Sequence, residues 1–149
     1  KRFLEACRRC GIDGIILPDL PVDIFDAEYR ELFEESDIYP VFLVTPRTPT
    51  ERVREIATKS KGFLYVVSSA TTTGATGQFT AEQRSALEQI GALNLDIPLL
   101  TGFGIHNAAT FRDATEHTHG AIIGSAFIKI LNQKPSPASA VEVLMQQLT

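Results

Sequence analysis

The chain has 149 residues, of which 44% are hydrophobic and 21% are charged, and its formal net charge is −4. These values are typical of one globular domain with a sizeable core, and they argue against a basic surface for nucleic acid or acidic lipid. No apolar run approaches the roughly 20 residues of a membrane-spanning helix, and residues 1–10 lack the apolar core of a signal peptide. We therefore expect a cytoplasmic protein that binds neither nucleic acid nor membrane.

The sequence alternates short apolar runs with amphipathic segments at a spacing of roughly 30 residues. The apolar runs predict strands at residues 12–17, 41–44, 63–67, 98–101 and 119–123. The amphipathic segments predict helices at residues 1–10, 23–35, 50–60, 81–93, 107–115, 125–131 and 138–148. Strands that alternate with helices form parallel βαβ units with right-handed crossovers, so we expect an α/β fold with a parallel sheet.

Polar residues mark the starts of two of these helices. Asn107 is predicted to cap the helix at 107–115, and Thr48 or Thr50 is predicted to cap the helix at 50–60. The side-chain oxygens of these residue types accept hydrogen bonds from the first helical turn, which otherwise leaves N–H groups without partners.

Two glycine loops follow the last two predicted strands. The fifth strand runs into Gly124-Ser125, and the fourth runs into Gly102-Phe103-Gly104. The first N–H groups of a helix carry the positive end of its dipole and favour a phosphate, which glycine allows to approach the backbone. The hydroxyl of Ser125 adds one donor. We expect the two loops to hold one phosphate between them, although tight βα turns without a ligand also use glycine.

The position of these loops favours one architecture over another. A doubly wound sheet has its phosphate loop after the first strand as G-x-G-x-x-G, which this sequence lacks. In an eight-fold βα barrel, the loops after the last two strands and a short extra helix bind phosphate. We therefore expect residues 1–149 to form a single partial TIM-barrel domain, a (β/α)8 fold covering about strands 4–8. A complete barrel takes about 250 residues, so about three N-terminal units are expected to be absent.

The one long predicted loop covers residues 68–79. Its residues are small and polar and include no aliphatic anchor before Phe79. Such a loop is mobile unless a ligand orders it. We interpret it as a lid over the site, with a disordered tether as the alternative.

The remaining reactive side chains indicate no metal or redox site. Cys7 and Cys10 form a lone Cys-x-x-Cys without the second pair that a zinc site needs. Asp19 is the only acid at the carboxyl end of a predicted strand, and it is better explained as a turn residue than as a catalytic group. The histidines are interpreted as surface or turn residues, and only the first lies on the ligand face: His106, His117 and His119.

Five motifs extend over nearly the whole chain. They are Asp13-Gly14-Ile15-Ile16-Leu17-Pro18-Asp19-Leu20-Pro21-Val22, Tyr65-Val66-Val67-Ser68-Ser69, Thr73-Gly74-Ala75, Gly102-Phe103-Gly104-Ile105 and Gly124-Ser125-Ala126. Together they resemble the C-terminal three-fifths of the tryptophan synthase α subunit family. The first and the Thr-Gly motif are specific to that family, whereas the last two also fit other phosphate-binding barrels.

The resemblance implies a lyase of tryptophan biosynthesis that cleaves indole-3-glycerol phosphate into indole and glyceraldehyde 3-phosphate. It also implies an α2β2 complex in which indole passes to a β subunit carrying pyridoxal phosphate, so no cofactor is expected in this chain. The family's catalytic glutamate and aspartate lie on strand two and the loop after it, which precede Lys1. The resemblance therefore implies no catalytic carboxylate here, and we expect the chain alone to be inactive.

The resemblance further assigns residues to the site. The phosphate-binding positions are Gly74, Gly102, Phe103, Gly104, Gly124 and Ser125. The substrate pocket is lined by Leu43, Tyr65 and Thr73, and Thr73 is the lid threonine that supports closure over the site. The loop Pro18-Asp19-Leu20-Pro21 faces the partner subunit. The lid departs from relatives at Ser69, Thr71 and Thr72, so the resemblance does not define how it moves.

Two other functions stay open. The chain could belong to another phosphate-sugar TIM-barrel enzyme, because such barrels share the glycine motifs, or it could be a non-catalytic phosphate-binding half-barrel. A structural consequence is common to all three. Five parallel strands cannot close an eight-strand barrel, so the strands at 12–17 and 119–123 are left as edges, through which we expect the chain to self-associate.

Overall fold

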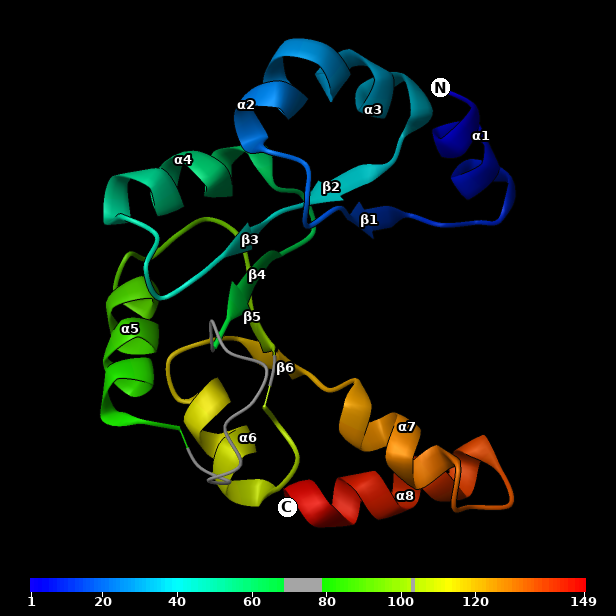
Figure 1. The fold of residues 1–149 in the computed structure, drawn as a ribbon, viewed down its shortest axis with the longest axis vertical. Helices are drawn as coiled ribbons and strands as arrows, with labels where there is room; N and C mark the ends of the chain where they lie inside the picture. Colours follow the sequence, from blue (N-terminus) through cyan, green and yellow to red (C-terminus); the bar gives the residue numbers. More distant parts are fainter. Residues whose placement is uncertain (69–78, 103) are drawn as a thin grey trace.

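Parallel strands run through the centre of the molecule, and helices cover one side of them (Figure 1). The computed structural model describes residues 1–68, 79–102 and 104–149. The strands are β1 (Gly14–Ile16), β2 (Tyr39–Val41), β3 (Leu43–Val44), β4 (Leu64–Val67), β5 (Leu99–Gly102) and β6 (Gly120–Ile122). The helices are α1 (Arg2–Arg9), α2 (Val22–Ile24), the π-helix η1 (Phe25–Tyr29), α3 (Arg30–Ser36), α4 (Thr50–Lys59), α5 (Ala81–Gly91), α6 (Ala108–Thr115), α7 (Ser125–Leu131) and α8 (Pro137–Leu148). The predicted alternation of strands and helices is confirmed.

All strand pairs are parallel, in the orders β1-β2 and β3-β4-β5-β6. The prediction of one continuous strand at 41–44 is wrong, because the ladder is interrupted at Phe42. The N–H of Phe42 donates to Ser60 Oγ at 3.1 Å instead of to a neighbouring strand. The chain remains tied across the break, since Lys61 N–H donates to Pro40 O at 2.8 Å and Tyr65 N–H donates to Phe42 O at 3.0 Å.

The predicted helix at 23–35 is also interrupted. It begins as α2, widens into η1 and continues as α3. Phe25 at the start of η1 is buried and makes edge-to-face contacts with Phe33 and Phe42, at centroid distances of 5.2 and 5.0 Å. Aromatic packing of this kind is favourable, and π-helical turns occur as local bulges within α-helices. The periodicity of the sequence does not distinguish such a bulge from a regular helix.

The N-cap residues of α6 and α4 test two predictions from the sequence. Asn107 caps α6 as predicted, because its side chain accepts a hydrogen bond from Thr110 N–H at 2.9 Å. The prediction that Thr48 or Thr50 caps α4 is wrong. The N-cap residue is Pro49, and the Thr48 hydroxyl instead accepts from Thr45 N–H at 3.0 Å. A threonine that forms a local turn no longer offers its oxygen to the helix.

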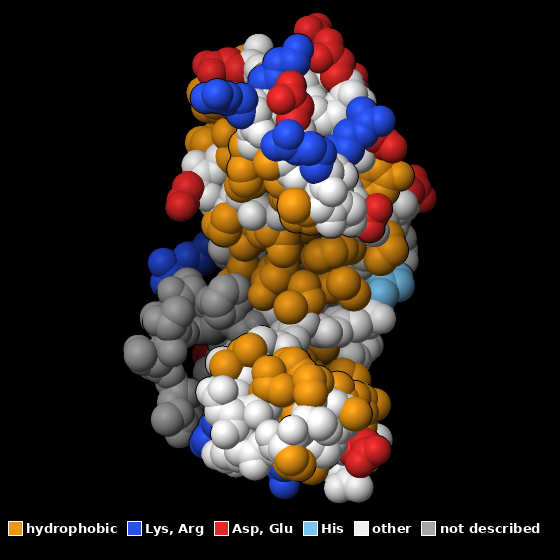
Figure 2. All heavy atoms as spheres, turned by 90° about the vertical axis from the view of Figure 1, so that its right-hand side faces the viewer, with side chains coloured by type: hydrophobic (Ala, Val, Ile, Leu, Met, Phe, Trp, Pro, Cys, Tyr) orange, Lys and Arg blue, Asp and Glu red, His pale blue; other side chains and the backbone are white. Residues whose placement is uncertain are grey.

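The register divides the sheet residues into two faces, because side chains alternate along a strand. One row of aligned residues is almost fully buried: Val44, Val66 and Thr101. Val44 and Val66 belong to the core cluster that also contains buried residues of α4 and α5. The other face carries the aligned residues Leu43, Tyr65, Leu100 and Gly120, and then Val67, Gly102 and Ile122. Most of these side chains are only partly buried. Hydrophobic side chains gather across the middle of the side shown in Figure 2.

Candidate functional site

The two predicted glycine loops begin at the same edge of the sheet. Strands β5 and β6 are paired in parallel, with Gly102 aligned to Ile122. Gly104 and Gly124 each lie two residues beyond this aligned pair. The carboxyl ends of parallel strands share one edge, and in βα barrels this edge carries the ligand site. The register therefore brings the loop after β5 next to the loop after β6, as the sequence predicted.

Gly102 lies directly beneath the side chain of Tyr65. A Cβ at Gly102 would lie 1.9 Å from Tyr65 Oη and 2.3 Å from its Cζ, which is far closer than any real contact. Glycine is therefore required here by close approach and not by an unusual φ angle. The aromatic wall of the predicted pocket and the predicted phosphate loop are in direct contact.

Leu43 and Tyr65 are aligned neighbours on β3 and β4, so the two predicted pocket residues lie side by side. Leu100 on β5 continues the same row. Tyr65 is 8% exposed, and burial raises the pKa of its phenol above the ordinary value of about 10. The phenol is therefore neutral near pH 7 and can donate a hydrogen bond. The row provides an apolar wall with one polar group.

Sequence reasoning missed the contribution of Ser68. Its hydroxyl donates to Gly102 O at 2.8 Å and its N–H donates to the same oxygen at 3.0 Å. Ser68 is 1% exposed and follows β4 directly. A small polar residue at the end of an apolar strand was the available signal. This double hydrogen bond holds the end of β5 against the end of β4, on which Tyr65 lies.

The three described loop residues at the predicted phosphate position differ in geometry. Gly104 is exposed and has a φ of +76°, which only glycine adopts readily. Gly124 is the N-cap of α7, and no heavy atom of the described residues lies within 4 Å of a Cβ position there. Ser125 is exposed and is the first residue of α7. The described residues therefore leave the space beside Gly124 open.

Several predicted site residues lie outside the described part of the chain. They are Thr73 and Gly74 in the predicted lid, together with Phe103 between the two glycines of the β5 loop. The lid residues Ser69, Thr71 and Thr72 are also outside it. Their assignments stay predictions.

The loop of residues 18–21 follows the carboxyl end of β1 in the two-stranded sheet, whereas the glycine loops follow strands of the four-stranded sheet. Pro18, Asp19 and Pro21 are exposed, whereas Leu20 is partly buried and packs against the core. Pro21 is the N-cap of α2. Leu20 thus anchors the loop to the core, and the other three side chains face solvent.

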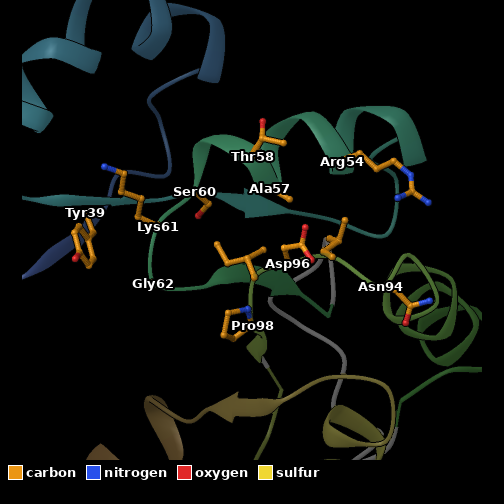
Figure 3. A pocket seen from close by; sticks show the side chains of 12 residues that line it. Tyr39, Arg54, Ala57, Thr58, Ser60, Lys61, Gly62, Asn94, Asp96 and Pro98 are labelled. Carbon is orange, nitrogen blue, oxygen red and sulfur yellow. The ribbon is translucent and has the colours of Figure 1, made fainter.

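A cleft of the described residues lies at the opposite end of the strands (Figure 3). It has a volume of about 720 Å³, and Lys61 and Pro98, which precede β4 and β5, contribute to its lining. Its cations are already engaged: Arg54 donates to Leu93 O at 3.3 Å, and the Lys61 ammonium lies 5.9 Å from the centre of the Tyr39 ring. In βα barrels, residues at this end support stability, so we do not assign the site to this cleft.

The candidate acid, metal and redox residues do not converge. Within residues 1–68, 79–102 and 104–149, no three His, Cys, Asp or Glu side chains form a group that could hold a metal ion. Cys7 is buried in the core and Cys10 is exposed, and neither forms a disulfide in this structure. His119 accepts a hydrogen bond from Leu99 N–H at 3.0 Å, which agrees with its interpretation as a turn residue. No described helix is long and apolar enough to cross a membrane.

The curved parallel strands, the outer helices and the glycine loops at the carboxyl ends define a segment of a (β/α)8 TIM barrel. A family model described as tryptophan synthase alpha chain matches residues 1–148. The chain belongs to the tryptophan synthase alpha chain family.

Named relatives and solved structures agree with this assignment. The chain is 43% identical over 148 residues to the tryptophan synthase alpha chain of Parabacteroides distasonis, covering 99% of this chain and 58% of the relative. It is 49% identical over 134 residues to that of Flavobacterium johnsoniae, covering 90% and 53%. A mutant tryptophan synthase alpha-subunit from Pyrococcus furiosus is 30% identical with a TM-score of 0.77, covering 98% of this chain and 58% of that one. The chain thus spans somewhat more than half the length of these relatives.

Proposed function

We propose that the chain carries the substrate-binding part of a lyase that cleaves indole-3-glycerol phosphate into indole and glyceraldehyde 3-phosphate in tryptophan biosynthesis. The observation that carries this proposal is the match of residues 1–148 to the alpha chain family. The geometry supports it, because Gly102 is aligned with Ile122, so that both glycine loops begin at one edge of the sheet, and Gly102 contacts the buried Tyr65.

The phosphate of the substrate is proposed to lie between the β5 and β6 loops. Glycine at both loops allows an anion to approach backbone N–H groups, and the first turn of α7 adds the positive end of a helix dipole. Gly124 has open space beside it, and the Ser125 hydroxyl supplies a further donor. Gly74 and Phe103 are proposed to complete the phosphate site, and Thr73 to close over the substrate.

The indole ring is proposed to pack against the row of Leu43 and Tyr65. An apolar wall excludes water from one side of the substrate. Because Tyr65 contacts Gly102, the residues proposed to bind the indole ring pack directly against the loop proposed to bind the phosphate.

Proton transfer is proposed to depend on carboxylates that this chain does not carry. The reaction needs a proton on the indole ring carbon and the removal of another from a glycerol hydroxyl. Asp19 is the acid at the carboxyl end of β1, and it is exposed in a turn between two prolines. In the sequence, no Asp or Glu stands within three positions after the end of β2, β3, β4, β5 or β6. We therefore propose binding without cleavage for this chain alone.

The partner is proposed to be a tryptophan synthase β subunit that carries pyridoxal phosphate, in an α2β2 complex. Pro18, Asp19 and Pro21 are exposed after the carboxyl end of β1. We propose that they contact the β subunit, which receives the released indole. No cofactor is proposed for this chain, and its location is proposed to be the cytoplasm.

The test is a comparison of two phosphate esters by calorimetric titration of the intact chain. Indole-3-propanol phosphate lacks the glycerol hydroxyl groups needed for cleavage but keeps the ring and the phosphate, whereas glycerol 3-phosphate lacks the ring. We expect the indole ester to bind at least about tenfold more tightly, since burial of an aromatic ring contributes more than about 1.4 kcal/mol. Equal affinities would favour another phosphate-sugar barrel, and no binding of either ester would contradict the proposal.

A further inference from the structure

A chain of hydrogen bonds links the first turn of α6 to Gly104. Thr110, which is 1% exposed, donates its N–H to Asn107 Oδ1 at 2.9 Å. Asn107 Nδ2 lies 3.4 Å from His106 Nε2, and His106 Nδ1 lies 2.8 Å from Gly104 O. Each of the two ring nitrogens of His106 therefore faces a polar atom. The sequence predicted only a surface or turn residue at this position.

Two independent constraints define the same tautomer of His106. A carbonyl oxygen only accepts hydrogen bonds, so the nitrogen that faces Gly104 O carries the proton. At the other side, Asn107 Oδ1 is held by Thr110, which turns the amide NH2 toward His106. An NH2 group only donates, so Nε2 is the unprotonated acceptor. The neutral form of the imidazole therefore carries its proton on Nδ1.

The imidazole of His106 faces the carbonyl of Gly104, a residue whose backbone is in the left-handed region. Gly104 has a φ of +76°, and a Cβ there would meet no atom of the described residues within 4 Å. Its glycine is therefore required by conformation and not by space. A glycine in open space is free to change conformation, unless its peptide groups are held by hydrogen bonds. Ile105, which is 4% exposed, anchors the next position in the core.

We propose that His106 is a positioning residue of the phosphate loop. Its Nδ1–H holds the Gly104 carbonyl and so keeps the adjoining N–H groups of the loop turned toward the ligand. The role rests on the proposed function, because the loop is useful only if it binds the phosphate of the substrate. His106 acts through Gly104 and does not need to touch the ligand.

The first experiment measures the dissociation constant of inorganic phosphate for the intact chain and three variants. We expect His106→Ala to raise this constant about three- to tenfold, the range that loss of one hydrogen bond produces. His106→Asn is expected to restore most of the affinity. An asparagine amide can donate to the carbonyl two residues before it, as Asn94 Nδ2 does to Ala92 O at 3.3 Å. His117→Ala, which removes a histidine at the amino end of β6, is expected to leave the constant unchanged.

The second experiment reads the tautomer by ¹⁵N NMR of the histidine side chains at about pH 8, where an ordinary imidazole is neutral. We expect His106 to show a protonated Nδ1 and an unprotonated Nε2. A role in general stability alone would lower the unfolding temperature of both His106 variants without rescue by asparagine.

The outcomes separate this inference from the proposed function. If the unaltered chain binds phosphate and Gly124→Asp abolishes binding, but His106→Ala leaves it unchanged, the positioning role is overturned and the phosphate site stands. A protonated Nε2 with an unprotonated Nδ1 also overturns the role. If the unaltered chain binds no phosphate, the site itself is overturned, and the role of His106 with it.

Discussion

Tyr65 occupies the space that any side chain at Gly102 would need. The two residues lie on neighbouring strands, and a Cβ at Gly102 would be 1.9 Å from the Tyr65 hydroxyl oxygen. The pocket wall and the phosphate loop are therefore not independent parts of the site. A change at one of them has to move the other.

Replacement of Gly102 by alanine tests this contact. The added methyl group forces the Tyr65 ring out of its place, so we expect Gly102→Ala to lower the free energy of unfolding by about 1–3 kcal/mol and to weaken binding of the indole ester. Urea unfolding and calorimetric titration measure the two effects. Gly124→Ala is the matched control, because a Cβ there meets no atom of the part of the chain that the structure describes within 4 Å. Equal unfolding midpoints for the two variants would show that Tyr65 does not pack on Gly102.

A negative charge at Gly124 tests the position of the phosphate. A carboxylate a few ångströms from the anion repels it by a few kcal/mol at low effective dielectric. We therefore expect Gly124→Asp to raise the dissociation constant of phosphate at least about tenfold, and less so at high salt. Gly124→Asn has nearly the same size without the charge and is a favoured N-cap, so it is expected to bind better than the Asp variant. Unchanged affinity in Gly124→Asp would place the phosphate elsewhere.

The catalytic competence of the chain alone is a separate question from binding. Positioned proton transfer contributes about 10²–10⁴-fold to a rate, and we propose that both groups that perform it lie outside residues 1–149. We expect no measurable release of indole from indole-3-glycerol phosphate, even under conditions where the indole ester binds. Indole release comparable with that of a full-length relative would contradict this, and Asp19→Asn would then be the first variant to assay.

Ion pairs between α2–η1 and α4 predict a dependence of stability on pH. Arg52 donates to both carboxylate oxygens of Asp23, at 3.0 and 2.9 Å, and Lys59 pairs with Asp26 and Glu55. Hydrogen bonds from Arg52 lower the pKa values of Asp23 and Glu55, and one from Lys59 lowers that of Asp26. A carboxyl group whose pKa is lower when folded stabilises the protein above its unfolded pKa and loses that contribution as the pH falls.

We therefore expect the contribution of this network to the urea midpoint to be constant between about pH 6 and 8. Below about pH 4 we expect the urea midpoint to fall, because the carboxylates become protonated. In the variant Arg52→Met/Lys59→Met the fall with pH should be shallower, because the cations that lower the carboxyl pKa values are gone. Asp23 is exposed and the other members of the network are partly exposed, so the effect should shrink as salt screens the charges. Identical pH profiles for the variant and the unaltered chain would contradict the assignment.

The open edges of the sheet predict self-association. Among the described strands, β1 pairs only with β2 and β6 pairs only with β5, so each leaves one edge unpaired. Ile16 on β1 is 39% exposed. Exposed apolar surface costs roughly 25 cal/mol per Å², and unpaired edges accept further strands. We expect sedimentation at micromolar concentration to show dimers or larger species.

A charge at the edge provides the control for this prediction. Ile16→Lys is expected to reduce association, because lysine on an edge strand opposes pairing. Ile128→Lys changes an isoleucine that is 53% exposed and lies on helix α7 rather than on an edge strand, and it is expected to leave association unchanged. A monomer that unfolds cooperatively at all concentrations would mean that another element covers the edges.

The sequence by itself determined the features that depend on local patterns. The alternation of apolar runs and amphipathic segments predicted the order of strands and helices, since each period belongs to one type of element. Asn107 was predicted as a cap because its side chain acts on the next turn of the same helix. The positions of the glycine loops and the family motifs indicated a partial TIM barrel, which the structure and the relatives confirm.

Only the tertiary structure decided how these elements meet. The contact of Tyr65 with Gly102 depends on the register between β4 and β5, and the break at Phe42 depends on a hydrogen bond to Ser60, which is 18 residues away. Likewise, the two histidines differ in the group that Nδ1 faces. Nδ1 of His106 faces the carbonyl of Gly104, whereas Nδ1 of His119 accepts a hydrogen bond from Leu99 N–H. A residue's own neighbours in the sequence set its local preferences, but register and side-chain contacts arise between segments that are distant along the chain.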